Sequence, residues 1–433
     1  MKKLLCLILA ALLLFGLAAC GGQNTEQTQQ PPKETTSVSQ YKSGDGYTEL
    51  TEPLSWEEIN KFPIKSADMS IDELRQLCVD FFRYSKIAQW IPNDNWDFFH
   101  RSNNQGEDTL YGGMVYGGLP YIGLASSAIY RLLDYMDQET GVVNIKDAGE
   151  YPKMFGNQCA QGAYVGWSRV INSPNYEGTP GMTKYRGFYL VGDYTYKNIE
   201  KMEKWSADYG TDEVVRDEID EFDLYEYYAL MQHGDGIVYY TTAGHVVMIA
   251  TDPVVVRTAD GKIDPEESYA TVIDQTPTWK EATNESGQRY EYQANVDAKW
   301  TFKYMRQHNY LPITFAEFLG LDPIEETEIR FAHQGDSITM EQLTSTDITC
   351  NYHIYDAYAA VYDSYGNEVL KLVNHSNYAS NYDARFSTTP AINDEIFGNV
   401  ASLKAGGDYT VKIYAQLGTG ERPTLWEGKL IVE

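Results

Sequence analysis

The chain has 433 residues and a formal net charge of −28 at pH 7, and 43% of its residues are hydrophobic. Such an acidic surface excludes charge-driven binding of nucleic acid, and this length predicts two folded domains. No nucleic-acid partner is therefore expected.

The first twenty residues have the pattern of an export signal. Two lysines follow Met1, and the apolar run at 4–17 is shorter than a helix that spans a bilayer, so we expect the segment to be cleaved. Residues 17–20 are Leu-Ala-Ala-Cys before a glycine, which resembles the lipobox of bacterial lipoproteins. The resemblance implies a signal peptide at 1–19, lipidation of Cys20, and anchoring to the outer face of the bacterial cell membrane.

Residues 20–46 are rich in Gln, Thr, Ser and Pro and contain almost no large apolar residue. A segment of this kind cannot bury enough surface to offset its ordering, so it is predicted to be a flexible tether. The folded part is expected to begin near Tyr47. No later apolar run is long enough to cross a membrane, so the rest of the chain is expected to be an exported folded protein that is anchored through its lipid.

The three cysteines beyond the signal, Cys78, Cys159 and Cys350, are too few and too far apart for a disulfide framework. Cys78 lies in the stretch 70–82, where apolar residues recur at helical spacing after a Ser and a Glu placed as a capping box. Cys78 is therefore predicted to be a core residue. Cys350 lies in a β-like run and is also interpreted as structural.

Five glycines lie in the stretch from Tyr111 to Gly123, both ends included. They predict unusual backbone conformations or the close approach of another segment. They do not predict a phosphate loop, because the Lys-Ser/Thr ending of such loops is missing. A helix is expected from about Leu124 to Met136, followed by a loop that leads to Cys159.

Cys159 lies at the start of a predicted buried helix that continues to about Val170. Gly156 and Asn157 before it are turn and N-cap residue types, and small or apolar residues follow it. In the first helical turn, unpaired N–H groups and the positive end of the helix dipole favour thiolate over thiol. We interpret Cys159 as a nucleophile. The alternative is a small buried hydrophobic residue.

Residues 172–227 are interpreted as an insertion, to which we assign no chemistry. After it, two apolar runs at 236–240 and 245–250 flank a turn that contains glycine, which predicts a β-hairpin. His245 begins the returning strand. A third strand is predicted at 269–277, and it carries Asp274.

A strand-initial histidine with a carboxylate on the neighbouring strand would complete a triad of nucleophile, base and orienting acid: Cys159, His245 and Asp274. Two alternatives remain open. A lone histidine on a strand is often only a hydrogen-bonded structural residue. Adjacent residues of a strand point to opposite faces, so either Asp274 or Gln275 could face the imidazole.

These segments, in this order, resemble the CHAP and NlpC-type cell-wall hydrolases, which have a papain-like fold. The resemblance covers about 111–277. It rests on Gln-Cys at the start of a helix, Gly-Asp before a strand, Gly-His-Val opening the next strand, and Asp-Gln-Thr on a third. It implies that Cys159 is the nucleophile, His245 the base and Asp274 the orienting acid.

Two further positions match the family. Pro120-Tyr121 resembles the Pro-Tyr pair of NlpC-type members, whose tyrosine lines the active site, and Gln158 matches the CHAP residue before the cysteine. The NlpC branch has Asp before and Ser after its cysteine, whereas this chain has Gln158 and Ala160. The backbone N–H of Cys159, helped by Tyr121 or Gln158, would hold the oxyanion.

The implied reaction is acyl transfer. The thiolate attacks an amide carbonyl, the imidazolium protonates the leaving amine, and water then clears the thioester. The implied partner is peptidoglycan or another cell-wall peptide. No Cys/His cluster has metal-ligand spacing, so we expect neither a metal nor a cofactor.

The C-terminal part has a different pattern. Residues 298–319 are expected to be helical and to close a catalytic domain at 47–325. From 326 to 433, short alternating runs and turns predict an immunoglobulin-like β-sandwich, interpreted as a spacer or wall-binding module. The predicted strands are 327–331, 347–355, 359–362, 366–372, 409–415 and 425–432. Four scattered histidines, His308, His333, His353 and His375, are interpreted as structural.

The predicted fold class is therefore α+β, with a papain-like domain before an all-β sandwich. The favoured function is a lipid-anchored, extracytoplasmic cysteine peptidase or amidase acting on peptidoglycan. The alternative is a surface ligand-binding or adhesion lipoprotein built on an inactive papain-like domain. A transporter's solute-binding lipoprotein fits the lipobox, but it does not fit the strand pattern.

Overall fold

The computed structural model describes residues 50, 53–99, 107–122, 127–145, 156–172, 188–192, 211–213, 215–216, 219–240, 244–375, 382–389 and 394–433. The expected signal peptide, Cys20 and the tether lie outside the described residues, as does most of the expected insertion. Lipidation of Cys20 therefore stays a prediction. In the described part, no helix has the length and apolar character needed to cross a membrane.

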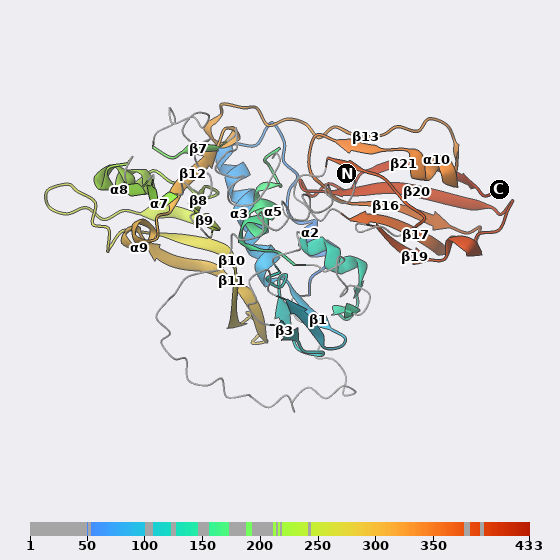
Figure 1. The fold of residues 1–433 in the computed structure, drawn as a ribbon, viewed down its shortest axis with the longest axis horizontal. Helices are drawn as coiled ribbons and strands as arrows, with labels where there is room; N and C mark the ends of the chain where they lie inside the picture. The colour runs from blue at the N-terminus through green and yellow to red at the C-terminus, as the bar shows by residue number, and fades with distance from the viewer. Residues whose placement is uncertain are drawn as a thin grey trace, which may run out of the picture.

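The chain is a mixed α/β structure with several β-sheets and more strand than helix (Figure 1). The largest sheet has ten strands in the order β5-β6-β1-β4-β11-β10-β9-β8-β12-β7. Its strands are β1 (Gln89–Pro92), β4 (Tyr116–Gly117), β5 (Met136–Asp137), β6 (Val142–Val143), β7 (Phe188–Leu190), β8 (Gly236–Tyr240), β9 (Gly244–Val254), β10 (Tyr269–Thr283), β11 (Arg289–Thr301) and β12 (Leu311–Phe315). A separate ribbon pairs β2 (Trp96–Phe99) with β3 (Glu107–Leu110).

Helices α3 (Ile71–Ile87) and α5 (Cys159–Trp167) pack against each other and against β9 and β10. Figure 1 shows both between the long strands of the large sheet and the C-terminal strands. The predicted capping box of α3 is confirmed, because Ser70 and Glu73 exchange hydrogen bonds at its start. Among the described residues, this region also contains the helices α2 (Trp56–Ile59), η2 (Ile129–Asp134), α7 (Thr211–Glu213), α8 (Glu221–Ala229), α9 (Phe302–Gln307) and η5 (Glu317–Leu319).

Small residues let α5 lie close to the sheet. A Cβ on Gly166 would lie 2.7 Å from atoms of both Phe82 and Met248. A side chain there would push α5 away from α3 and β9, because real Cβ atoms do not approach so closely. The predicted burial of this helix is confirmed, since Cys159 and all its later residues except Gln161 are buried.

Two expectations about helices are wrong. The described part of the expected helix at 124–136 is a short 3₁₀ helix, η2, followed by strand β5. The expected helical segment at 298–319 contains the end of β11, then α9, then strand β12 and η5. β12 is buried along its whole length between β8 and β7, and a short apolar run of this kind cannot be assigned to helix or strand from periodicity alone.

The C-terminal strands form two further sheets. A six-stranded sheet has the order β14-β21-β20-β16-β17-β19, and a three-stranded sheet has the order β13-β15-β18. Their elements are β13 (Ile329–Phe331), β14 (Ser337–Thr339), α10 (Met340–Ser345), β15 (Ile348–Cys350), β16 (Ile354–Tyr362), β17 (Glu368–His375), β18 (Asp383–Ala384), β19 (Asp394–Gly398), η6 (Val400–Ser402), β20 (Tyr409–Leu417) and β21 (Thr424–Ile431). The predicted strands overlap these, whereas β14, β18, β19 and α10 were not predicted.

The C-terminal sheets contact the far end of α5 directly. The hydroxyl groups of Ser168, which caps the helix, and Tyr355 on β16 are 3.3 Å apart. The rings of Tyr164 and His353 meet edge to face, with their centroids 5.8 Å apart. The helix that carries Cys159 at its start therefore touches the C-terminal sheets at its end.

Candidate active site

Cys159 is the first residue of α5, as predicted. The N-cap, however, is Gln158 and not the expected Asn157. The backbone N–H of Gln158 donates to Gln161 Oε1 at 3.2 Å, while Asn157 Oδ1 accepts from the backbone N–H of Ser127 at 3.0 Å. The sulfur thus lies in the first turn of a nine-residue helix, where the helix dipole stabilises a negative charge.

The predicted hairpin brings the backbone next to the histidine close to the cysteine. β8 and β9 pair in antiparallel fashion, and His245, the second residue of β9, lies opposite Tyr239. Cys159 Sγ is 3.9 Å from the carbonyl oxygen of Gly244, the residue just before the histidine. The start of α5 and the start of β9 therefore meet.

Asp274 contacts the histidine ring. Its Oδ2 atom is 2.7 Å from His245 Nε2, and its Oδ1 atom accepts from the backbone N–H of Asn295 at 3.0 Å. The strand pairing of β10 with β11 shifts register between Val272 and Asp274, and such an irregularity can re-aim a side chain. The sequence left either Asp274 or Gln275 facing the ring; in the structure it is Asp274.

The segment that contains Tyr121 lies beside the residues before the cysteine. Tyr121 and Asn157 form a parallel bridge, in which the backbone N–H of Ile122 donates to the Asn157 carbonyl at 3.1 Å. The backbone N–H of Asn157 donates in turn to the Pro120 carbonyl, also at 3.1 Å. Tyr121 is buried and Gln158 is half-buried. Both residues therefore come from backbone next to the start of α5.

Asp235, part of the Gly-Asp match, has a structural position. Its carboxylate pairs with Arg75 on α3 at 2.6 Å, and both side chains are buried. It also accepts from the backbone N–H of Gln232 at 2.8 Å. This pair joins α3 to the turn before β8, and it does not contact the candidate triad.

Aromatic side chains that the sequence did not assign to the site flank His245. The ring centroids of Trp300 and Tyr310 each lie 6.5 Å from that of the imidazole. Burial, together with the negative charge of nearby groups that include Asp274 and Cys159, raises the pKa of Tyr310 well above its ordinary value. Trp300 is the second-last residue of β11 and Tyr310 precedes β12, and both lie in the region that was expected to be helical.

The three candidate residues differ in exposure. Cys159 has no exposed surface, the side chain of Asp274 is 1% exposed and that of His245 is 23% exposed. The histidine thus forms the solvent-facing part of the group. A substrate can reach the sulfur only if neighbouring atoms move.

The other two described cysteines have unreactive environments. Burial raises the pKa of Cys78 far above its ordinary value, and burial also raises that of Cys350 to about 11. Reactive thiols need the opposite shift, because the thiolate is the nucleophile. The structural interpretation of Cys78 and Cys350 is consistent with these shifts.

The sequence also missed a buried lysine near the triad. Lys86, in the last turn of α3, donates to Gln275 Oε1 at 2.5 Å. A signal existed, because Cys78, Phe82 and Lys86 are spaced four residues apart on one helix face, and the first two are core.

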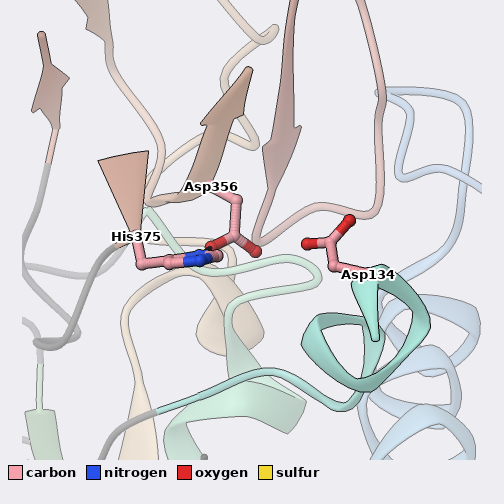
Figure 2. A group of neighbouring side chains, drawn as sticks. All are labelled: Asp134, Asp356 and His375. Carbon is pink, nitrogen blue, oxygen red and sulfur yellow. Dashed lines mark hydrogen bonds and ion pairs between the residues drawn. The ribbon is translucent and has the colours of Figure 1, made fainter. Parts of the chain in front are cut away.

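A second His–carboxylate group lies where η2 meets the C-terminal strands. The ligand atoms of Asp134, Asp356 and His375 lie within 4.8 Å of one another (Figure 2). Carboxylates and imidazole are metal-ligand types. However, His375 Nδ1 is 2.5 Å from Asp356 Oδ1 and Nε2 is 3.2 Å from Glu395 Oε2, so a metal would have to displace these hydrogen bonds.

Tyr135 completes this group, which we call the interface cluster: Asp134, Tyr135, Asp356, His375 and Glu395. The Tyr135 hydroxyl donates to Glu395 and lies 3.3 Å from His375 Nε2. Four members, Tyr135, Asp356, His375 and Glu395, form a buried hydrogen-bond network that joins the η2 segment to β16, β17 and β19. Asp134 accepts from the Tyr358 hydroxyl at 2.8 Å.

The structure thus places the start of α5, which carries Cys159, next to the start of β9, and it pairs His245 on β9 with Asp274. Asp235 and His375 contact other groups. Comparisons of the chain with protein-family models, with curated proteins and with solved structures found no match.

Proposed function

We propose that this chain is a lipid-anchored, extracytoplasmic cysteine amidase or peptidase that cleaves amide bonds in peptidoglycan peptides. In this proposal, residues 47–325 form a papain-like domain of NlpC or CHAP type, and residues 326–433 form an immunoglobulin-like sandwich. Cys159 is the nucleophile, His245 the base and Asp274 the orienting acid.

One observation carries the proposal. Three segments far apart in the chain meet, so that His245 Nε2 contacts Asp274 Oδ2 at 2.7 Å and Cys159 Sγ lies 3.9 Å from the carbonyl before the histidine. A nucleophile at a helix start, a histidine on a strand and a buried carboxylate behind that histidine are the parts of an activated nucleophile.

Each of the three residues has a role in the proposed reaction. Because Nε2 of His245 faces Asp274, its Nδ1 is the ring nitrogen that takes the proton of the Cys159 thiol. The thiolate then attacks the amide carbon, a C–S bond forms, and the imidazolium gives its proton to the amide nitrogen as the C–N bond breaks. His245 next takes a proton from water, the hydroxide displaces the thiolate, and a carboxylate product leaves.

Charge also develops on the carbonyl oxygen during the attack. The backbone N–H of Cys159 at the start of α5 is a suitable donor, with Tyr121 or Gln158 as the second. Loss of one such donor typically costs about 3 to 4 kcal/mol of transition-state stabilisation. The adjacent segments at 120–122 and 157–158 would supply this site.

The burial of Cys159 favours a second candidate function. A sulfur with no exposed surface is what a surface ligand-binding or adhesion lipoprotein with an inactive papain-like domain would have. In that case His245 and Asp274 form a structural hydrogen bond, and the chain holds wall peptides without cleaving them.

Incubation of the full chain with purified wall fragments, followed by mass spectrometry, separates the two candidates. The proposal predicts that the wild type and a Cys350→Ala control release cleaved peptides, while Cys159→Ala releases them about a thousandfold more slowly. Cleavage by Cys159→Ala at the wild-type rate would contradict the proposal. Retention of intact fragments without cleavage by any variant would favour the binding protein.

A further inference from the structure

A chain of buried hydrogen bonds runs behind the candidate triad. Lys86 Nζ on α3 donates to Gln275 Oε1 at 2.5 Å. Gln275 Nε2 donates to the carbonyl oxygens of Leu119 at 3.0 Å and Gln293 at 2.9 Å. Each of the two amide hydrogens of Gln275 therefore has a carbonyl partner, and its oxygen has the lysine.

Gln293 continues the chain toward the cysteine. Its Oε1 atom accepts from the backbone N–H of Tyr121 at 2.7 Å, and its Nε2 atom donates to the Pro277 carbonyl at 3.1 Å. Tyr121 is bridged to Asn157, two residues before Cys159. The bonds thus connect the strand next to Asp274 with the backbone that leads into α5.

Lys86 also lies under the first turn of α5. A Cβ on Gly162 would lie 3.1 Å from Lys86 Nζ and 3.1 Å from Gln275 Cβ. Gly162 is three residues after Cys159, on the same side of the helix. The absence of a side chain at this position lets the ammonium group approach the helix start, where a positive charge favours a thiolate.

Burial of an ammonium group is unfavourable, because the charge loses its hydration. Lys86 is 2% exposed, and burial lowers its pKa to about 7, although the negative charge of Asp274 acts to raise it. A methionine or leucine at this position of the helix would avoid the loss of hydration. Lys86 is therefore a buried cation with an unfavourable loss of hydration, close to the helix that carries the thiol and within electrostatic range of Asp274.

We propose that Lys86, Gln275 and Gln293 are positioning residues for the candidate triad. Lys86 supplies a positive charge behind Asp274 and the start of α5. Gln275 and Gln293 fix the Leu119–Tyr121 segment against the residues that precede Cys159. The inference rests on the proposed function, because it assigns these residues a role in that same reaction.

The charge part is tested by the pH profile of Cys159 alkylation with iodoacetamide on the full chain, followed by peptide mass spectrometry with Cys78 as the internal reference. Removal of a nearby positive charge disfavours the thiolate. Lys86→Met should therefore move the alkylation midpoint upward by about one pH unit and lower the rate at pH 6 about tenfold. Lys86→Arg, which keeps the charge, should retain the wild-type midpoint.

Lys65→Met is the matched control. Lys65 is another buried lysine, and its ammonium donates to the Glu325 carbonyl and lies 4.0 Å from the ring centroid of Tyr352. Its replacement should leave the Cys159 profile unchanged. A Lys86→Met profile that superimposes on the wild type, with wild-type Cys159 faster than Cys78, would overturn the inference but not the proposed function.

Gln275→Glu tests the positioning part, and it decides the matter if Lys86→Met does not fold. Glutamate keeps an acceptor for Lys86 but loses both donors to the carbonyl oxygens. The expected result is a kcat on wall fragments about tenfold lower, with KM within twofold. An unchanged kcat would overturn the inference. Wild-type Cys159 that is as slow as Cys78 would overturn the proposed function, and this inference with it.

Discussion

Among the described histidines that contact carboxylates, His245 and His375 have surroundings that differ in ways that separate chemistry from structure. His245 has one carboxylate, Asp274, on Nε2, and its side chain is 23% exposed beside the start of α5. His375 has a carboxylate on each ring nitrogen, Asp356 and Glu395, and is 1% exposed.

The difference shows what a His–carboxylate pair can and cannot indicate. A base must have a ring nitrogen that can accept a proton from a reacting group, and both nitrogens of His375 are engaged with acids. His245 has a thiol near its backbone, a carboxylate on the far nitrogen and a solvent-facing edge. The more exposed pair, next to the start of α5, is therefore the one suited to catalysis, and the buried pair is suited to a structural role.

The largest expected effect follows from replacement of His245, the proposed base in the more exposed His–carboxylate pair. His245→Ala should lower the rate of wall-fragment cleavage about a thousandfold or more, because proton transfer to and from the substrate is lost. The melting temperature should change little, since the side chain is partly exposed. Activity assays with wall fragments and circular dichroism measure both quantities. A rate within tenfold of the wild type would contradict the catalytic role of His245.

The next effect concerns the buried pair. Asp356→Asn should lower the free energy of unfolding by about 3 kcal/mol, because a buried His–carboxylate contact loses its charge partner. Cleavage per folded molecule should stay within twofold of the wild type. Urea unfolding and active-site titration give the two values. Full stability with lost activity would reverse the roles assigned to the two pairs.

The pH dependence of stability offers a sharper test of His375. Burial and Arg131 act to lower the pKa of His375, but Asp356 and the hydrogen bonds to Asp356 and Glu395 outweigh them and raise it above its ordinary value. A raised pKa in the folded state means that the contribution is fully present below about pH 6.5 and is lost as the pH rises through the folded value.

We therefore expect the stability difference between the wild type and His375→Gln to shrink as the pH rises above 6.5. For one titrating group, the slope cannot exceed about 1.4 kcal/mol per pH unit. Unfolding curves at several pH values between 6 and 9 measure it. A difference that grows with pH would show that the cluster does not hold a protonated His375.

The smallest expected effect is at the hydroxyl group that joins the cluster to the η2 segment. Tyr135→Phe removes the hydrogen bond to Glu395 but keeps the ring, which packs against Phe397. The free energy of unfolding should fall by about 1 to 2 kcal/mol, with no change in cleavage. An unaltered stability would mean that the two regions are held together by their apolar contacts alone.

The sequence predicted the parts of the site whose local patterns are strong. The capping box of α3, the apolar runs of β8 and β9 and the Gly-Asn turn residues before Cys159 each depend on neighbours in the chain. The start of α5 and the position of His245 on β9 could therefore be anticipated. The choice between Asp274 and Gln275 could not, because it depends on a register irregularity between β10 and β11.

Other features of the structure were not predicted, because they depend on tertiary contacts between segments far apart in the sequence. β11 was missed because polar and aromatic residues alternate irregularly along it, and its side chains are mostly half-buried. Lys86 was overlooked because a charged residue in the last turn of a helix normally faces solvent. His375 and Glu395 come from strands whose meeting with Tyr135 is a tertiary contact.

The central claim is that Cys159 is an activated thiol, with His245 as its base and Asp274 as the acid that orients His245. The most direct measurement is the rate of iodoacetamide alkylation at pH 6, followed by peptide mass spectrometry at Cys78, Cys159 and Cys350 in the full chain. The account predicts that Cys159 reacts much faster than the other two and that His245→Ala abolishes the difference. Equal, slow alkylation of all three cysteines in the wild type would contradict it.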